Sequence, residues 1–320
     1  MCTAISINGK HHLFGRTLDL ERSYGEAVVI TPQNFEFPYR YQSKAASAHA
    51  IIGIAHVSNG IPLYYDAVNE HGLCAAALNF PLSAVYKKMH VGKTDVASYE
   101  LIPFVLQRCE SVSQAEELLR SVNITPDSIS PSLPATPLHW IFADKQGAIV
   151  AEPREDGLKI HKDPFRVLTN EPEFAYHTRN VTSYMSLSAA PPENKLCPSI
   201  ELSPFSRGMG AMGLPGDYSS ASRFVRSVFA KSHTLMDNEI SGFFHVMDTV
   251  FVPSGCVITN QGAPVCTVYS SCIDADTLTY HFTTYNCRRI RAVKLCESAV
   301  AGTLLSVYPI ERDEDILYIQ

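Results

Sequence analysis

The sequence has few charges, no long apolar run and no closely spaced cysteine pairs, and each shortage excludes a class of protein. Charged residues make up only 18% of the 320 residues and the net charge is -6, which argues against a surface for nucleic acid or anionic membranes. No stretch approaches the ~18 apolar residues of a membrane span. Lys10, His11 and His12 interrupt the first apolar stretch, so we expect no signal peptide and a cytoplasmic protein.

The cysteines also argue against a zinc site. They number nine, and no two of them have the CxxC spacing that a metal site would use, so we expect neither a metal nor a cofactor. In a reducing compartment most of them should be small buried hydrophobic residues. Cys2 is the exception, because it directly follows the initiator methionine.

Alternating apolar residues predict two groups of strands. The first opens with a hairpin at Asn8-Gly9, a strong two-residue turn signal. The further predicted strands cover residues 27–32, 49–57, 63–68, 73–80, 138–144, 148–153, 158–163, 165–170, 263–273, 278–285 and 288–295.

Helical periodicity predicts four helices between these groups. Two of them begin at Ser98 and at a capping box formed by Ser113 and Glu116, and two more cover 219–232 and 238–251. Residues 185–217 are rich in proline, serine and glycine and predict a long loop. The order of strands, helices, strands, helices and strands predicts an α+β fold in which two packed sheets carry helices on both outer faces. We expect one domain over 1–320, because no linker divides the chain; two domains are the weaker alternative.

The second residue offers the chemistry of an amidase. Initiator methionine is generally removed when the next residue is small, and the mature chain would then begin with Cys2. An α-amine has a pKa of about 7.7–8.0 and can act as a base near neutral pH. A thiol with a pKa of about 8.5 is already a good nucleophile. One residue could therefore supply both nucleophile and base.

The predicted hairpin places further side chains near Cys2. A turn at Asn8-Gly9 pairs Cys2 with Gly15, which would leave open space before the thiol, and puts Cys2 on the face of Gly15 and Asp19. A bulge would instead bring Arg16 to that face. A surface ion pair between Arg16 and Asp19 is the structural alternative.

Seven segments resemble the choloylglycine hydrolase family of N-terminal nucleophile (Ntn) hydrolases, which contains bile salt hydrolases and penicillin V acylases. They are MCTAI (1–5), FGRTLDLE (14–21), NEHGLCAAALNFP (69–81), VLTNEPEF (167–174), GLPGDYSSASRFVR (213–226), TVYSSCID (267–274) and FTTYNCRRI (282–290). The resemblance implies a four-layer αββα sandwich, amide hydrolysis and a homotetramer.

The resemblance also implies the catalytic residues. These are Cys2 as nucleophile and base, together with Arg16, Asp19, Asn79, Asn170 and Arg223. Asn79 stands where bile salt hydrolases tend to carry asparagine and penicillin V acylases tyrosine, so it favours glycine- or taurine-conjugated bile acids as substrates. Asn79 and Asn170 each follow an apolar strand, where an amide could donate to an oxyanion; a turn-capping role is the alternative.

The same resemblance implies an apolar substrate cleft. Its walls would come from Leu20, Tyr24, Tyr65, Ala67 and Leu133. Simple core packing is an alternative for each of them. Penicillin V acylase and N-acyl homoserine lactone acylase activities remain alternatives with the same catalytic core, and acyl transfer to an amine is a possible side activity.

Overall fold

The computed structural model describes residues 1–42, 49–131, 133–237 and 239–320 and is built on two antiparallel sheets. The first, sheet A, consists in spatial order of β12 (Val167–Leu168), β1 (Cys2–Asn8), β2 (His12–Leu20), β14 (Pro264–Asp274), β15 (Thr279–Thr284) and β16 (Arg291–Lys294), with β13 (Val257–Ile258) paired to β14. The second, sheet B, consists of β11 (Gly157–Lys162), β10 (Ala148–Arg154), β9 (Leu138–Ala143), β6 (Cys74–Asn79), β5 (Ile61–Asn69), β4 (Ile51–Ser58), β3 (Glu26–Thr31) and β17 (Ser306–Pro309).

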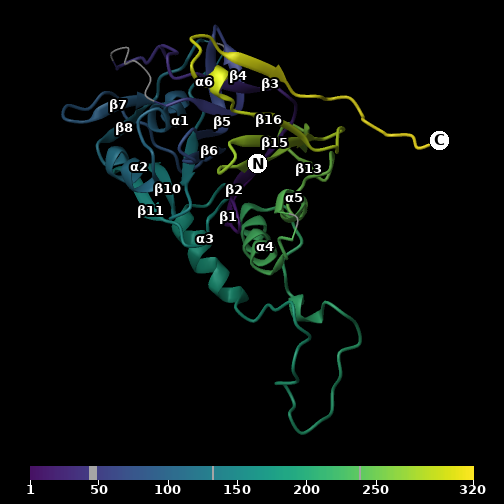
Figure 1. Ribbon diagram of the computed structural model, residues 1–320. Helices are drawn as coiled ribbons and strands as arrows, with labels where there is room; N and C mark the ends of the chain where they lie inside the picture. Colours follow the sequence, from purple (N-terminus) through teal and green to yellow (C-terminus); the bar gives the residue numbers. More distant parts are fainter. Residues whose placement is uncertain (43–48, 132, 238) are drawn as a thin grey trace.

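Helices cover the outer face of each sheet. The helices α4 (Ser220–His233) and α5 (Glu239–Asp248) pack on sheet A, and α1 (Leu101–Leu106) and α2 (Val112–Leu119) pack on sheet B (Figure 1). The remaining elements are α3 (Phe174–Asn180), α6 (Glu297–Val300), the parallel pair β7 (Thr94–Ala97) and β8 (Val122–Thr125), and 3-10 turns at Ser98–Glu100, Val181–Tyr184 and Met209–Ala211. The predicted αββα sandwich is confirmed.

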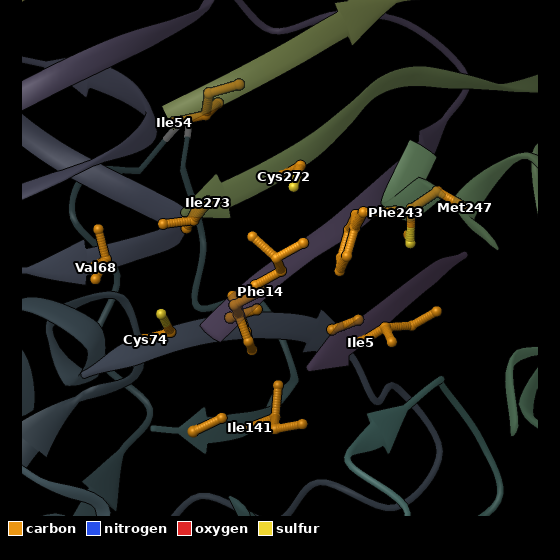
Figure 2. Close-up of a cluster of buried hydrophobic side chains, with 14 of the residues drawn as sticks. Ile5, Phe14, Ile54, Val68, Cys74, Ile141, Phe243, Met247, Cys272 and Ile273 are labelled. Carbon is orange, nitrogen blue, oxygen red and sulfur yellow. The ribbon is translucent and has the colours of Figure 1, made fainter. Parts of the chain in front are cut away.

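Two apolar clusters hold the layers together. One fills the space between the sheets and continues under α4 and α5, and the other lies between sheet B and the helices α1 and α2. Figure 2 shows Phe14 of β2 in the first cluster, with Val68, Cys74 and Ile141 of sheet B around it and Phe243 of α5 nearby. Burying a large apolar side chain contributes about 1.5–3 kcal/mol, so this shared cluster ties the two sheets into one unit.

Of the two predicted helix starts before residue 120, the first is confirmed and the second is wrong. The first helical segment begins at Ser98, as a 3-10 turn over Ser98–Glu100, and becomes α-helical at Leu101. The next helix is capped by Ser111 and not by Ser113, because the Ser111 hydroxyl accepts the Gln114 backbone N–H at 3.3 Å.

The predicted long loop is confirmed over 185–217. Only the 3-10 turn at Met209–Ala211 interrupts it, and Figure 1 shows the segment extending away from the two sheets. Its apolar side chains are unusually exposed; those of Met185, Leu196 and Phe205 are 84%, 87% and 84% accessible. We name residues 185–217 the arm.

The register of the first hairpin differs from the prediction. Asn8 pairs with His12 across a three-residue loop, so Cys2 lies opposite Leu18 and not opposite Gly15. Because side chains alternate along a strand, this register puts Arg16 on the face of Cys2 and turns Asp19 to the other face. Gly15 leaves no space for the thiol; a Cβ there would lie 2.0 Å from the Ser271 carbonyl oxygen and 2.9 Å from the Phe243 ring. The glycine instead allows close packing of β14 and α5.

Candidate active site

Cys2 is the first residue of β1, and its side chain points into the space between the two sheets. Its side chain is 2% exposed and belongs to the wall of a cavity of ≈ 580 Å³. In the unprocessed chain Met1 also lines this cavity, and its amino group donates to the Asp19 carbonyl at 2.7 Å. Removing Met1 would therefore free both the Cys2 nitrogen and part of the cavity.

Arg16 is the cation on the cavity side of Cys2. It is fully buried, and its Nη1 donates to the carbonyls of Ala77 (2.6 Å) and Tyr65 (3.1 Å) in sheet B, while Nε donates to Thr17 (3.2 Å). Burial lowers the pKa of Arg16, but the negative charges around it, that of Cys2 first, outweigh this effect and leave the pKa raised. Within the described residues its Nη2 has no hydrogen-bond partner although it is buried. That donor is available to a thiolate or a substrate oxygen.

Asn170 holds the backbone nitrogen of Cys2. Its Oδ1 accepts the Cys2 N–H at 2.7 Å, and its Nδ2 donates to the Asn79 carbonyl at 2.8 Å. These partners assign the two ends of the Asn170 amide: Oδ1 faces Cys2, because an oxygen can only accept from N–H donors, and Nδ2 faces the Asn79 carbonyl. One Nδ2 hydrogen remains for a developing oxyanion, and the amide oxygen orients the future α-amine. Asn79 lines the cavity beside Cys2.

Arg223 reaches Cys2 from the opposite side of sheet A. It projects from the first turn of α4, is fully buried, and donates from Nη1 to the Cys2 carbonyl and from Nη2 to Asn170 Oδ1 at 2.8 Å. Further bonds run to Thr3 Oγ1 (2.6 Å) and the Tyr218 carbonyl (3.1 Å). Burial lowers the pKa of Arg223, and the charges of Asp19 and Cys2 only partly offset this. All three of its nitrogens are used to hold the chain around Cys2.

Asp19 supplies a negative charge on the same side of sheet A as Arg223. Its carboxylate accepts the hydroxyls of Thr267 (2.7 Å) and Thr17 (3.2 Å), and its backbone N–H donates to the Met1 carbonyl at 3.0 Å. Burial raises the pKa of Asp19, and Arg223 and the chain's terminal ammonium group only partly offset this. The structure thus gathers all six residues implied by the resemblance around the start of the chain.

The cavity wall contains four of the five expected substrate residues. Leu20, Tyr24, Tyr65 and Leu133 line it. The expectation for Ala67 is wrong, because a β-bulge in the pairing of β4 with β5 at Tyr65 turns Ala67 to the other side of sheet B, where it is fully buried in the cluster facing α1.

Sequence reasoning missed several other residues of this wall. They include Arg22, His56, Tyr99, Ile102, Ile129 and Trp140. They come from separate segments that only the packing of sheet B against α1 and the proline-rich loop brings together. Nearness in the sequence could have found two of them, because Arg22 lies between Leu20 and Tyr24 and Ile129 precedes Leu133 in that loop.

Groups of side chains that could offer metal ligands lie elsewhere. They are His49, His71 and Glu110, and His11, Asp274 and Asp276. None of these residues lines the cavity at Cys2.

Comparison with known proteins agrees with this geometry. The family of linear amide C–N hydrolases known as the choloylglycine hydrolase family matches residues 2–308. The chain belongs to the choloylglycine hydrolase family. It is 41% identical to a bile salt hydrolase/transferase from Lactiplantibacillus plantarum, over 98% of each chain, and 31% identical to one from Clostridium perfringens, over 100% of each.

Solved structures share the fold. The conjugated bile acid hydrolase from Clostridium perfringens, in a cysteine-to-alanine mutant form, superposes with a TM-score of 0.93 at 30% identity over 100% of both chains. The penicillin V acylase from Agrobacterium tumefaciens superposes with a TM-score of 0.74 at 18% identity, over 96% of this chain and 90% of that one, which shows the common fold alone. The chain is thus an Ntn-type amide hydrolase. Within the described residues no helix has the length and apolarity to cross a membrane.

Proposed function

We propose that the protein is a bile salt hydrolase, which cleaves the amide bond between a bile acid and glycine or taurine. The observation that carries this proposal is the position of Cys2 in the wall of the ≈ 580 Å³ cavity, next to Arg16 and Asn79. The cavity is lined mainly by apolar and aromatic side chains, which suits a steroid, and its charged groups are few. The curated relatives named as bile salt hydrolases support the same substrate.

The first half of the reaction uses the N-terminal residue twice. The Cys2 thiolate attacks the amide carbonyl carbon, forming a carbon–sulfur bond, and the carbonyl oxygen becomes an oxyanion. Asn170 Nδ2 and Arg16 Nη2 supply donors for that oxyanion, and the Asn79 side chain is a third candidate. The α-amine of Cys2, oriented by Asn170 Oδ1, passes the thiol proton to the leaving nitrogen. The carbon–nitrogen bond then breaks, releasing glycine or taurine and leaving a thioester.

The second half hydrolyses the thioester. The same α-amine takes a proton from water, and the resulting hydroxide attacks the thioester carbon. The carbon–sulfur bond then breaks, the α-ammonium returns its proton to the Cys2 sulfur, and the free bile acid is released. An amine that reaches the thioester before water would instead form a new amide. Acyl transfer to amines is therefore part of the proposal, and relatives named bile salt hydrolase/transferase support it.

The test compares three proteins on three substrates. The native chain, a Cys2→Ala variant and a chain with an extra N-terminal residue that cannot be trimmed are assayed on glycocholate, taurocholate and penicillin V. We expect bile salt hydrolysis by the native chain alone, with the processed N-terminus confirmed by mass spectrometry. Full turnover by either altered chain would overturn the role of Cys2, and a preference for penicillin V would overturn the substrate.

We further propose that the whole chain, with Met1 removed, acts as one domain and assembles into a homotetramer in the cytoplasm. A shared cluster between the sheets supports the single domain. The exposed apolar side chains of the arm support contacts between copies, and all nine cysteines are free, as a reducing compartment requires. Light scattering of the native chain and of a Leu196→Ser/Phe205→Ser variant tests the assembly; a tetramer is expected for the native chain only.

A further inference from the structure

A buried carboxylate lies between the two sheets, behind Arg16. Asp66 belongs to β5, is fully buried, and turns toward sheet A. Three hydroxyls of sheet A donate to its two oxygens: Tyr269 at 2.5 Å, Ser271 at 2.9 Å, and Tyr280. An ionised carboxylate in an apolar core is stable only with such donors and a nearby cation.

The cation that faces this carboxylate is Arg16. Burial raises the pKa of Asp66, and Arg16 first, followed by the three hydroxyls, only partly offsets this, so the pKa remains raised. Asp66 in turn is one of the negative charges that raise the pKa of Arg16. Asp66 lies near Arg16 without occupying its Nη2, which has no hydrogen-bond partner within the described residues.

Two short chains of contacts also connect Asp66 to the position of Arg16. Ser271 donates its hydroxyl to Asp66 and accepts the Arg16 backbone N–H at 3.0 Å. Tyr65, the bulged neighbour of Asp66, accepts Arg16 Nη1 through its carbonyl at 3.1 Å. Anchoring Asp66 on sheet A therefore fixes both the strand that carries Arg16 and the carbonyl that holds its guanidinium.

We propose that Asp66 is a positioning residue that acts through Arg16: it anchors the β5 bulge to sheet A, so that the guanidinium faces Cys2 with one donor free. This inference rests on the proposed function, in which Arg16 assists the Cys2 thiol. It assigns a task to a carboxylate that the reaction itself does not use, and it explains why two buried tyrosines turn their hydroxyls to a single side chain.

A double-mutant cycle tests the proposal. The rate of Cys2 alkylation by iodoacetamide is measured, in the processed chains, for the native protein, Asp66→Asn, Arg16→Met and the double variant. We expect Asp66→Asn to change the alkylation rate about fivefold or more when Arg16 is present, and less than about twofold in the Arg16→Met background. A merely structural role would change the rate by the same factor in both backgrounds, and that result would overturn the proposal.

A second route covers the case in which Asp66→Asn does not fold. The Tyr269→Phe/Tyr280→Phe variant removes two donors from the same carboxylate and enters the same cycle with the same expectation. Asp144→Asn serves as the matched control, because Asp144 is also a buried carboxylate but accepts the backbone N–H groups of Val112, Gln146 and Gly147. It should leave the alkylation rate unchanged. Alkylation needs no bile salt, so the cycle remains readable even if glycocholate proves not to be a substrate.

Discussion

Arg16 and Arg223 are both fully buried and both lie beside Cys2, but they approach it from opposite faces of sheet A. Arg16 lies between the two sheets, makes three hydrogen bonds to backbone carbonyls, and keeps Nη2 free within the described residues. Arg223 projects from α4 toward sheet A and donates to four oxygens from three nitrogens. The surroundings raise the pKa of Arg16 and lower that of Arg223. One arginine is available for chemistry, and the other is committed to structure.

The largest expected effect comes from replacing each arginine by lysine. Arg16→Lys should lower kcat/KM on glycocholate by about 10³-fold, because a preorganised donor at the reacting atoms is lost. A lysine has three donors, which is enough to replace the three hydrogen bonds of Arg16 but not the four of Arg223. Arg223→Lys should therefore lower the free energy of unfolding by about 2 kcal/mol, a loss not expected for Arg16→Lys. Calorimetry and steady-state kinetics of both variants check this. Equal losses of Tm would remove the distinction between the two arginines.

A somewhat smaller effect is expected at Asn170, whose Oδ1 accepts hydrogen bonds from both Arg223 Nη2 and the Cys2 nitrogen. Asn170→Ala removes one oxyanion donor and the acceptor that orients the α-amine, so kcat should fall about 10²-fold with little change in KM. Asn286→Ala is the control, because Asn286 is an exposed asparagine just after β15 that donates to the Arg312 carbonyl. A rise in KM at unchanged kcat would indicate a binding role instead.

A moderate, pH-dependent effect on stability is expected at His177, on Arg223's side of the sheet. Its Nε2 bonds the Asn170 carbonyl at 2.8 Å, and its ring stacks on Phe224. Burial lowers its pKa, with His139 and Arg223 acting in the same direction. The unfolded chain therefore takes up a proton first, and stability is lost as the pH falls below about 6.5.

His177→Gln should flatten this dependence. Its Tm is expected to fall less between pH 7 and pH 5 than that of the native chain, whereas His245→Gln, at an exposed position, should leave the dependence as it is. Identical Tm-against-pH curves for the native chain and His177→Gln would contradict the assignment.

The smallest effect is expected in the cavity wall on Arg16's side. Leu133→Ala removes apolar contact with the substrate and should raise KM for glycocholate about fivefold, since a few buried methylene groups are worth about 1 kcal/mol. Because Leu133 is only partly buried, Tm should hardly change. A loss of kcat at constant KM would place Leu133 in the reaction and not in binding.

The sequence predicted the layers and most strands, because alternation and turn signals are local properties of the chain. It did not predict β17, which pairs residues 306–309 with β3 at the far end of the sequence, nor the parallel pair β7 and β8. The same limit applied at the site. Cys2 and its partners were found from chemistry and resemblance, whereas the face of Arg16 depended on whether the turn has two residues, Asn8 and Gly9, or three, residues 9–11.

The other failures have the same physical origin. Ala67 was misplaced by a single bulged residue, Tyr65, which changes the face of everything after it on β5. Asp66 carries no motif, and only the packing of β5 against β14 and β15 shows that its carboxylate meets Tyr269 and Tyr280. Side-chain alternation is readable from sequence; the points at which it shifts are not.

The start of β1 has an evolutionary consequence. Because successive side chains of a strand point to opposite faces, the nucleophile faces the cavity only while the number of residues between the chain start and the first turn stays fixed. Lineages of this protein should therefore not accept the gain or loss of a single codon between Thr3 and Asn8. Such a change would turn the thiol toward α4 while every catalytic side chain was still encoded. The length of this strand should be inherited as strictly as its buried side chains.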